Sequence, residues 1–184
     1  MKKVVLIITI LMSIFSTTQA QFQAFQKITP KESPCVDFNY YGTTRIDSSF
    51  GIFFFSLTEK GWAEAYTGLI YNPTSWLELT LGAGIEQAPS LYRLAGSVWM
   101  GSKKIDGFFV GEKGDGPDNW WYKTFLRYKY SEKVNFGLMS WRYSATGPFI
   151  GYQLSKKLEL WVNVGRDLEF HKDCAIVGFN FNMK

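Results

Sequence analysis

The chain has 184 residues, with 20 Lys and Arg, 16 Asp and Glu and a single His, and its formal net charge at neutral pH is +4. This length predicts one domain. The small charge excess gives no indication of nucleic-acid binding.

The first twenty residues have the pattern of an export signal. Lys2 and Lys3 precede an apolar run over residues 4–15, and Thr18-Gln19-Ala20 supplies the small residues of a cleavage site. We therefore predict that residues 1–20 are a signal peptide that is removed on maturation. The apolar run is too short to cross a bilayer, and no later stretch reaches the ~20 apolar residues that a membrane helix needs.

A two-residue alternation of apolar and polar side chains dominates the remaining sequence. In residues 77–85 the odd positions are all apolar, whereas the even positions carry glutamate, threonine or glycine. The alternation recurs in residues 119–130, 158–165 and 174–183. Successive side chains of a strand point to opposite faces, so this pattern predicts strands between an apolar and a polar environment. Many such strands in one chain predict a barrel or a sandwich.

Polar turns separate these strands and fall into two alternating groups. One group comprises residues 72–75, 102–104, 131–133 and 155–157, and the other comprises residues 58–61, 88–90, 111–119, 145–148 and 167–173. Alternate turns of an up-and-down barrel lie at the same rim. We expect the rim with the shorter turns and the C-terminus to face the periplasm, and the longer loops to face outward.

The number of strands stays open between two alternatives. Eleven strands can be counted from residue 36 onward, but bacterial single-chain barrels have an even number. Either residues 22–28 supply a twelfth strand, or residues 36–43 do not form a full wall strand. We predict an all-β fold, a single antiparallel up-and-down transmembrane β-barrel of about 10 to 12 strands over residues 36–184, preceded by an N-terminal segment, residues 21–35, that can hold a first strand.

The tryptophans indicate which face of the strands points into the barrel. Six of the seven lie in the polar phase of the alternation, and only Trp120 lies in the apolar phase. A soluble barrel would expose six indoles to water, whereas a lumen lets them pack among paired charges. The predicted lumen-lining residues are Trp62, Glu64, Trp76, Glu78, Arg93, Trp99, Trp121, Lys123, Arg127, Trp141, Glu159 and Trp161.

The two cysteines, Cys35 and Cys174, fall at the same predicted outer rim. Because the periplasm is oxidising, we predict a disulfide between them near the barrel seam. Such a bond requires a Cα separation of about 4.4 to 6.8 Å. The alternative is two separate buried thiols.

Taken together, these features resemble the small outer-membrane β-barrel proteins of Gram-negative bacteria as a class. The final strand, with Phe179 and Phe181, is similar to the aromatic-rich terminal strand that such proteins present to the assembly machinery. The class typically ends on an aromatic residue, whereas this chain continues through Asn182-Met183-Lys184. The resemblance implies an outer-membrane location, with the lipid bilayer and lipopolysaccharide as partners.

Motifs for catalysis and metal binding are missing from the sequence. Outer-membrane lipid A deacylases and phospholipases resemble this chain in architecture and use a histidine beside a serine. The single histidine, His171, has no serine near it in sequence. The loop at residues 114–119 lacks the ligand spacing and the distal glutamate of a calcium loop. We therefore predict no enzymatic activity, no cofactor and no metal.

Three classes of function remain. The first is a non-enzymatic outer-membrane barrel, either a closed structural module or a narrow channel for small polar solutes such as sugars, which stack on indole rings. The alternatives are an outer-membrane lipid-modifying hydrolase that uses His171 and a soluble periplasmic ligand-binding barrel. Ten strands or fewer would favour a filled interior, so the strand number bears directly on function.

Overall fold

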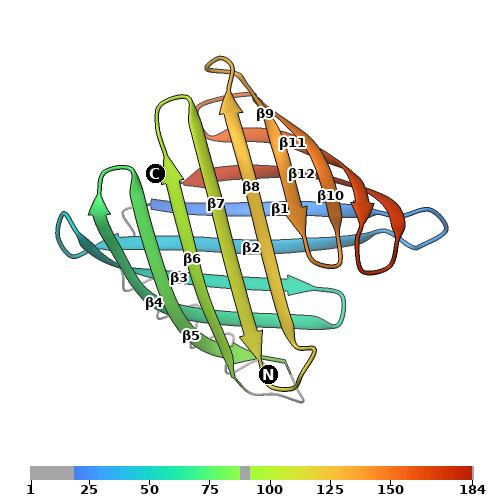
Figure 1. Ribbon diagram of the computed structural model, residues 1–184, viewed down its shortest axis with the longest axis horizontal. Coiled ribbons are helices and arrows are strands. Elements are labelled where there is room, and N and C mark those ends of the chain that lie inside the picture. The colour runs from blue at the N-terminus through green and yellow to red at the C-terminus, as the bar shows by residue number, and fades with distance from the viewer. Residues whose placement is uncertain (1–18, 88–91, 184) are drawn as a thin grey trace.

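A computed structural model describes residues 19–87 and 92–183 of the chain. These residues form twelve antiparallel strands that close into one barrel (Figure 1). The strands are β1 (Gln19–Ile28), β2 (Cys35–Arg45), β3 (Phe50–Glu59), β4 (Trp62–Thr74), β5 (Leu77–Glu86), β6 (Arg93–Gly101), β7 (Ile105–Gly114), β8 (Trp120–Lys129), β9 (Val134–Trp141), β10 (Ala145–Gln153), β11 (Leu158–Asp167) and β12 (Lys172–Met183). Each strand pairs with its neighbours in sequence, and β1 closes the barrel against β12. The predicted antiparallel up-and-down barrel is confirmed, with a strand number at the upper end of the expected range. Within the described ranges, no helix has the length and apolar character needed to cross a membrane as a helix.

The twelfth strand is β1, the segment that the sequence pattern left open. It pairs with β12 from Ala20 to Ile28 and with β2 from Gln19 to Lys27. On its outward face, the ring centroid of Phe22 lies 6.0 Å from that of Phe38 in β2 and 6.1 Å from that of Phe179 in β12. The first described residue, Gln19, thus falls inside the predicted signal peptide, and residues 1–18 of that segment lie outside the described residues.

The predicted disulfide is wrong, because Cys35 and Cys174 are both free thiols. Strand β1 runs between the two strands that carry them, with Lys27 paired to Cys35 on one side and to Ile176 on the other. Neighbouring strands lie about 4.8 Å apart, so positions two strands apart are separated by roughly 9.6 Å. This separation exceeds the ~6.8 Å that a disulfide can span.

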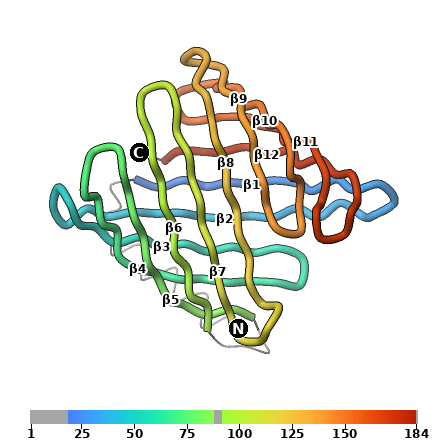
Figure 2. The backbone as a smooth tube through the Cα atoms, in the orientation of Figure 1, coloured from blue at the N-terminus to red at the C-terminus, as the bar shows by residue number. Residues whose placement is uncertain are grey.

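Serine side chains shape three of the tight turns at the rim that holds the end of β12. In each turn the hydroxyl of Ser102, Ser131 or Ser155 accepts hydrogen bonds from the amides two and three residues later. This local bonding explains why the repeated Ser-x-Lys pattern marks hairpins. We call this edge the terminal rim and the other edge, with the turns at residues 60–61, 115–119, 142–144 and 168–171, the opposite rim (Figure 2).

Two turns predicted for the opposite rim are not found at their expected positions in the described structure. The turn expected at residues 145–148 lies instead at residues 142–144, and β10 already begins at Ala145. The turn expected at residues 88–90 lies outside the described residues.

The outward face of the barrel is apolar. Leu81 is 73% exposed and Leu69 is 63% exposed, and leucines on β8 and β9 are similarly open. A water-soluble barrel would bury such side chains, whereas a barrel in lipid presents them outward. The outward leucines therefore contradict the soluble periplasmic alternative.

Candidate functional site in the barrel interior

The barrel interior holds a cavity of about 490 Å³ to which all twelve strands contribute side chains. Its lining runs from Gln21 and Asn180 near the terminal rim to Trp62 and Tyr143 at the opposite rim. The cavity therefore reaches from one rim to the other. Eleven of the twelve predicted residues lie on its wall: Trp62, Glu64, Glu78, Arg93, Trp99, Trp121, Lys123, Arg127, Trp141, Glu159 and Trp161.

The structure corrects the placement of Trp76, which is 53% exposed and lies in the turn between β4 and β5. The pairing of these two strands shifts register between Tyr71 and Thr74, and the turn follows directly. Trp76 thus lies outside the strands, where side chains no longer alternate between two faces.

One side of the cavity is an aromatic chamber, which we define by six side chains contributed by β1, β8, β9, β10 and β11. These are Phe25, Trp121, Phe125, Trp141, Phe149 and Trp161. The ring centroid of Trp141 lies 4.8 Å from that of Phe25 and 6.1 Å from those of Trp121 and Trp161. Edge-on and tilted contacts of this kind stabilise aromatic clusters, so the chamber offers indole and phenyl surfaces held in fixed positions.

Another side of the cavity carries an acidic cluster of three buried glutamates around Arg93. The guanidinium lies 3.0 Å from Glu64, 3.0 Å from Glu86 and 2.8 Å from Glu112. The Nε–H of Arg93 donates to Glu112, so the Glu64 oxygen Oε2 has an ionic contact without a directed hydrogen bond. Tyr66 donates a further hydrogen bond to Glu112, at 2.9 Å. Three carboxylates share one guanidinium here, which makes this part of the wall electronegative.

The wall near the terminal rim carries a second charge cluster. The carboxylate of Asp106 accepts two hydrogen bonds from Arg127, at 2.9 and 3.0 Å, and lies 2.6 Å from the ammonium of Lys129. Asp106 is almost fully buried, so the bidentate pair satisfies a carboxylate that would be costly to bury alone.

Arg142 connects three turns at the opposite rim, a role that its sequence context did not reveal. Its guanidinium lies 2.6 Å from Asp118 and 3.0 Å from Glu169, and it donates to the Trp120 carbonyl at 2.6 Å. It also stacks 3.7 Å above the Trp120 ring centroid. The partners of Arg142 come from both neighbouring turns, so only the folded barrel brings them together.

Replacing Arg142 by alanine should loosen the turns at the opposite rim. We expect roughly a fivefold or larger increase in the rate of limited proteolysis there, because locally opened segments are the ones that proteases cut. The matched control is Arg166→Ala, which removes an exposed arginine whose one side-chain hydrogen bond within the described residues goes to the His171 carbonyl. Equal cleavage rates in the two variants would contradict the connecting role.

The same contact has a defined pH dependence. The hydrogen bond from Arg142 lowers the pKa of the Asp118 carboxyl below its ordinary value. A carboxyl with a lowered pKa in the folded state adds stability at neutral pH and loses it as the pH falls through that lowered value. Protease resistance of residues 115–119 should therefore persist at pH 5 to 7 and decline only below about pH 4.

His171 lies in the turn between β11 and β12, with φ of 54°, and its side chain is exposed. Its imidazole forms no hydrogen bond or ion pair with any residue in ranges 19–87 and 92–183. The same ranges hold no group of three or more His, Cys, Asp or Glu suited to a metal ion. The described residues therefore offer the hydrolase alternative no paired nucleophile.

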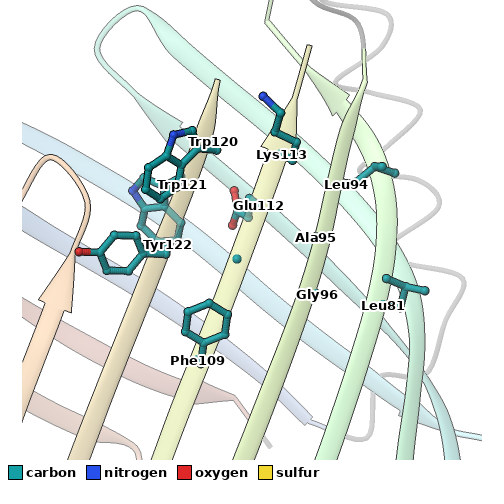
Figure 3. Close-up of a pocket in the computed structure, with 11 residues that line it drawn as sticks. Leu81, Leu94, Ala95, Gly96, Phe109, Glu112, Lys113, Trp120, Trp121 and Tyr122 are labelled. Atoms are coloured by element: carbon teal, nitrogen blue, oxygen red, sulfur yellow. The ribbon is translucent and has the colours of Figure 1, made fainter. Parts of the chain in front are cut away.

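A second hollow, of about 570 Å³, lies on the outward face between β5 and β8 (Figure 3). Its floor is the directly paired Gly96 and Gly111, and its sides include Leu81, Phe109 and Tyr122. The groove exists because these two glycines leave side-chain space empty on a surface that is otherwise covered by large apolar groups. Its position on the outward face separates it from the interior cavity.

Comparison with known proteins identifies the fold. No family model and no curated protein matches the chain. The solved structure of KdgM porin matches with a TM-score of 0.62 and 11% identity over 89% of this chain and 99% of the porin. A structure of KdgM porin in complex with disordered oligogalacturonate matches with a TM-score of 0.62 and 11% identity, over 91% of this chain and 100% of the porin. The chain thus has the fold of a small porin, which confirms the class resemblance at the level of the fold.

Proposed function

We propose that this protein is an outer-membrane channel for small polar solutes, with sugars among them. The observation that carries the proposal is the cavity that reaches from rim to rim inside a barrel whose outward face is apolar. The porin fold supports it, and the KdgM porin complex with oligogalacturonate supports a sugar-type solute. In this proposal residues 1–20 act as the export signal, and the outward face contacts the bilayer and lipopolysaccharide.

The dimensions of the cavity favour a narrow passage. A volume of about 490 Å³ spread along an apolar band about 25 Å tall leaves room for small solutes in single file. Among the described residues, the wall carries five basic and six acidic side chains, so the lining is close to neutral. A near-neutral lining favours sugars and solutes of low charge over polyanions.

The test is single-channel conductance of the purified protein in a planar bilayer. A gel shift between boiled and unboiled samples first establishes that the barrel is folded. We expect discrete conductance steps that scale with salt concentration. A folded barrel that never conducts would contradict the channel and favour a closed structural module.

A second measurement tests the involvement of the aromatic chamber in solute passage. Replacing Trp121 and Trp161 by alanine should alter the block of conductance by added sugar, because the rings provide the stacking surfaces. The control is Trp76→Ala, which removes an exposed indole outside the cavity. Unchanged sugar block in the double variant would leave the two rings as packing groups.

A further inference from the structure

Lys123 differs from the other basic side chains on the cavity wall. It projects from the middle of β8, and its ammonium lies 3.9 Å from the ring centroid of Trp141 and 6.0 Å from that of Trp161. Within residues 19–87 and 92–183, this ammonium has no hydrogen-bond acceptor and no carboxylate at ion-pair distance. The other basic side chains on the wall each face a carboxylate: Lys27, Arg93, Arg127 and Arg142. An unpaired interior charge is costly, and an anion would remove that cost.

A second donor without a partner lies beside this ammonium. The indole nitrogen Nε1 of Trp141 is buried and has no hydrogen-bond partner among the described residues. The neighbouring Trp161 is different, because its Nε1 donates to Asn180 at 3.2 Å. Indole and ammonium groups can only donate. The aromatic chamber therefore contains two donors for which the described protein supplies no acceptor.

The chamber walls restrict the rest of the ligand. Phe25, Phe125 and Phe149 contribute phenyl rings, and Met139 packs in the same cluster. A hydrated inorganic anion would leave these apolar faces without contacts, and a neutral sugar would leave the ammonium without a counter-charge. A polyanion would find, among the described residues of the wall, one cation without a carboxylate partner and six acidic side chains. These three comparisons favour a ligand with a single negative charge next to a flat apolar face.

We infer that Lys123 and Trp141 form a binding site, inside the aromatic chamber, for a small monocarboxylate that carries a flat apolar face. The carboxylate lies against the ammonium of Lys123 and the indole N–H of Trp141, and the flat face stacks on the surrounding rings. Aromatic acids and uronic monosaccharides share this chemistry. This inference rests on the proposed function, because the solute must enter through the channel. It adds the chemical class of solute that binds inside that channel.

Binding measured without conduction tests this site separately from the channel. The folded protein in detergent micelles is titrated with benzoate and its neutral isostere benzamide, and with glucuronate and neutral glucose, by isothermal titration calorimetry and tryptophan fluorescence. At least one acid should bind about tenfold or more tightly than its neutral counterpart, the difference expected of a charge-assisted hydrogen bond. The pair that shows the larger preference identifies an aromatic acid or a sugar acid as the source of the carboxylate.

Variants of two lysines on the same strand and the same face provide the control. In Lys123→Met, the acid and its neutral counterpart should bind with about equal affinity. Lys123→Arg should retain most of the preference for the acid, since the charge is kept. Lys129→Met should leave the preference unchanged, because Lys129 already faces Asp106. If Lys123→Met fails to fold by the gel-shift assay, Lys123→Gln replaces it.

Three results would overturn the site: no binding of either acid, equal affinity for acid and neutral compound in the unmodified protein, or a preference that survives in the folded Lys123 variant. Carboxylate preference without conductance would refute the channel and keep the site. Conductance without carboxylate preference would keep the channel and refute the site.

Discussion

Replacing Arg93 by methionine should prevent the barrel from folding at neutral pH. This guanidinium is the counter-charge shared by Glu64, Glu86 and Glu112, all of which are buried. Removing one partner of a buried ion pair costs about 3–5 kcal/mol, and here three carboxylates would lose their shared counter-charge at once. The total stability of a folded protein is only about 5–15 kcal/mol. We expect the gel shift of the unboiled sample to disappear, or the urea midpoint to fall sharply.

Two further variants test whether charge is the cause of this loss. Adding Glu64→Gln and Glu112→Gln to the Arg93→Met variant should restore much of the folding, because one carboxylate rather than three then lies without a counter-charge. The matched control is Arg127→Met, which leaves Asp106 in contact with Lys129 and should lower the midpoint much less. An unchanged midpoint in the Arg93→Met variant would show that the cluster contributes little to stability.

The alternation of side chains carried most of the information about the fold. A strand has a period of two residues, so each strand could be assigned an inward and an outward face from local sequence alone. Residues from separate strands, such as Trp62, Lys123 and Glu159, consequently lie on one cavity wall. The rule failed at Trp76 because that residue lies in a turn.

Information about closure was missing from the local pattern. In β1, Gln26 occupies an outward position opposite Val177 of β12, so polar side chains fall on both faces and the alternation is weak. Because β1 was not predicted as a definite strand, Cys35 and Cys174 were expected at neighbouring positions of the barrel seam. In the structure, the whole of β1 lies between the strands that carry them. Long-range register of this kind depends on which strands close the barrel, and periodicity does not encode it.

The ion-pair partners of the buried charged side chains could not be predicted from the sequence either. Arg93 was predicted to face the lumen, but its three glutamates come from β4, β5 and β7 and meet only after the strands are staggered. That no described carboxylate pairs with Lys123 could not be inferred either, because it depends on which side chains of other strands reach its ammonium. Local sequence therefore predicts which side chains line the interior, whereas the structure shows which charged side chains pair with one another.

Two glycine-to-alanine substitutions on adjacent strands should have opposite outcomes. At Gly84 in β5, an added Cβ would lie 2.0 Å from the Ala65 carbonyl oxygen and 2.4 Å from the Tyr66 Cα. Both are backbone atoms of β4, so relief requires the ladder between the two strands to shift. At Gly96 in β6, the nearest atom to an added Cβ is the Thr80 carbonyl oxygen, at 3.7 Å, which is ordinary van der Waals contact.

We therefore expect Gly84→Ala to destabilise the barrel by about 3 kcal/mol or more, at or above the upper end of the range for overpacking. Gly96→Ala should change stability by less than about 1 kcal/mol, with a small gain from the reduced freedom of the unfolded chain. Urea midpoints of the two variants in lipid vesicles measure the difference, and the chemical change is the same in both. Equal shifts would mean that β4 and β5 can separate to accommodate a methyl group. A large loss of stability in Gly84→Ala alone would identify close backbone contact as the reason for glycine at that position. The empty space over Gly96 would then be a feature of the outward groove and not a requirement of folding.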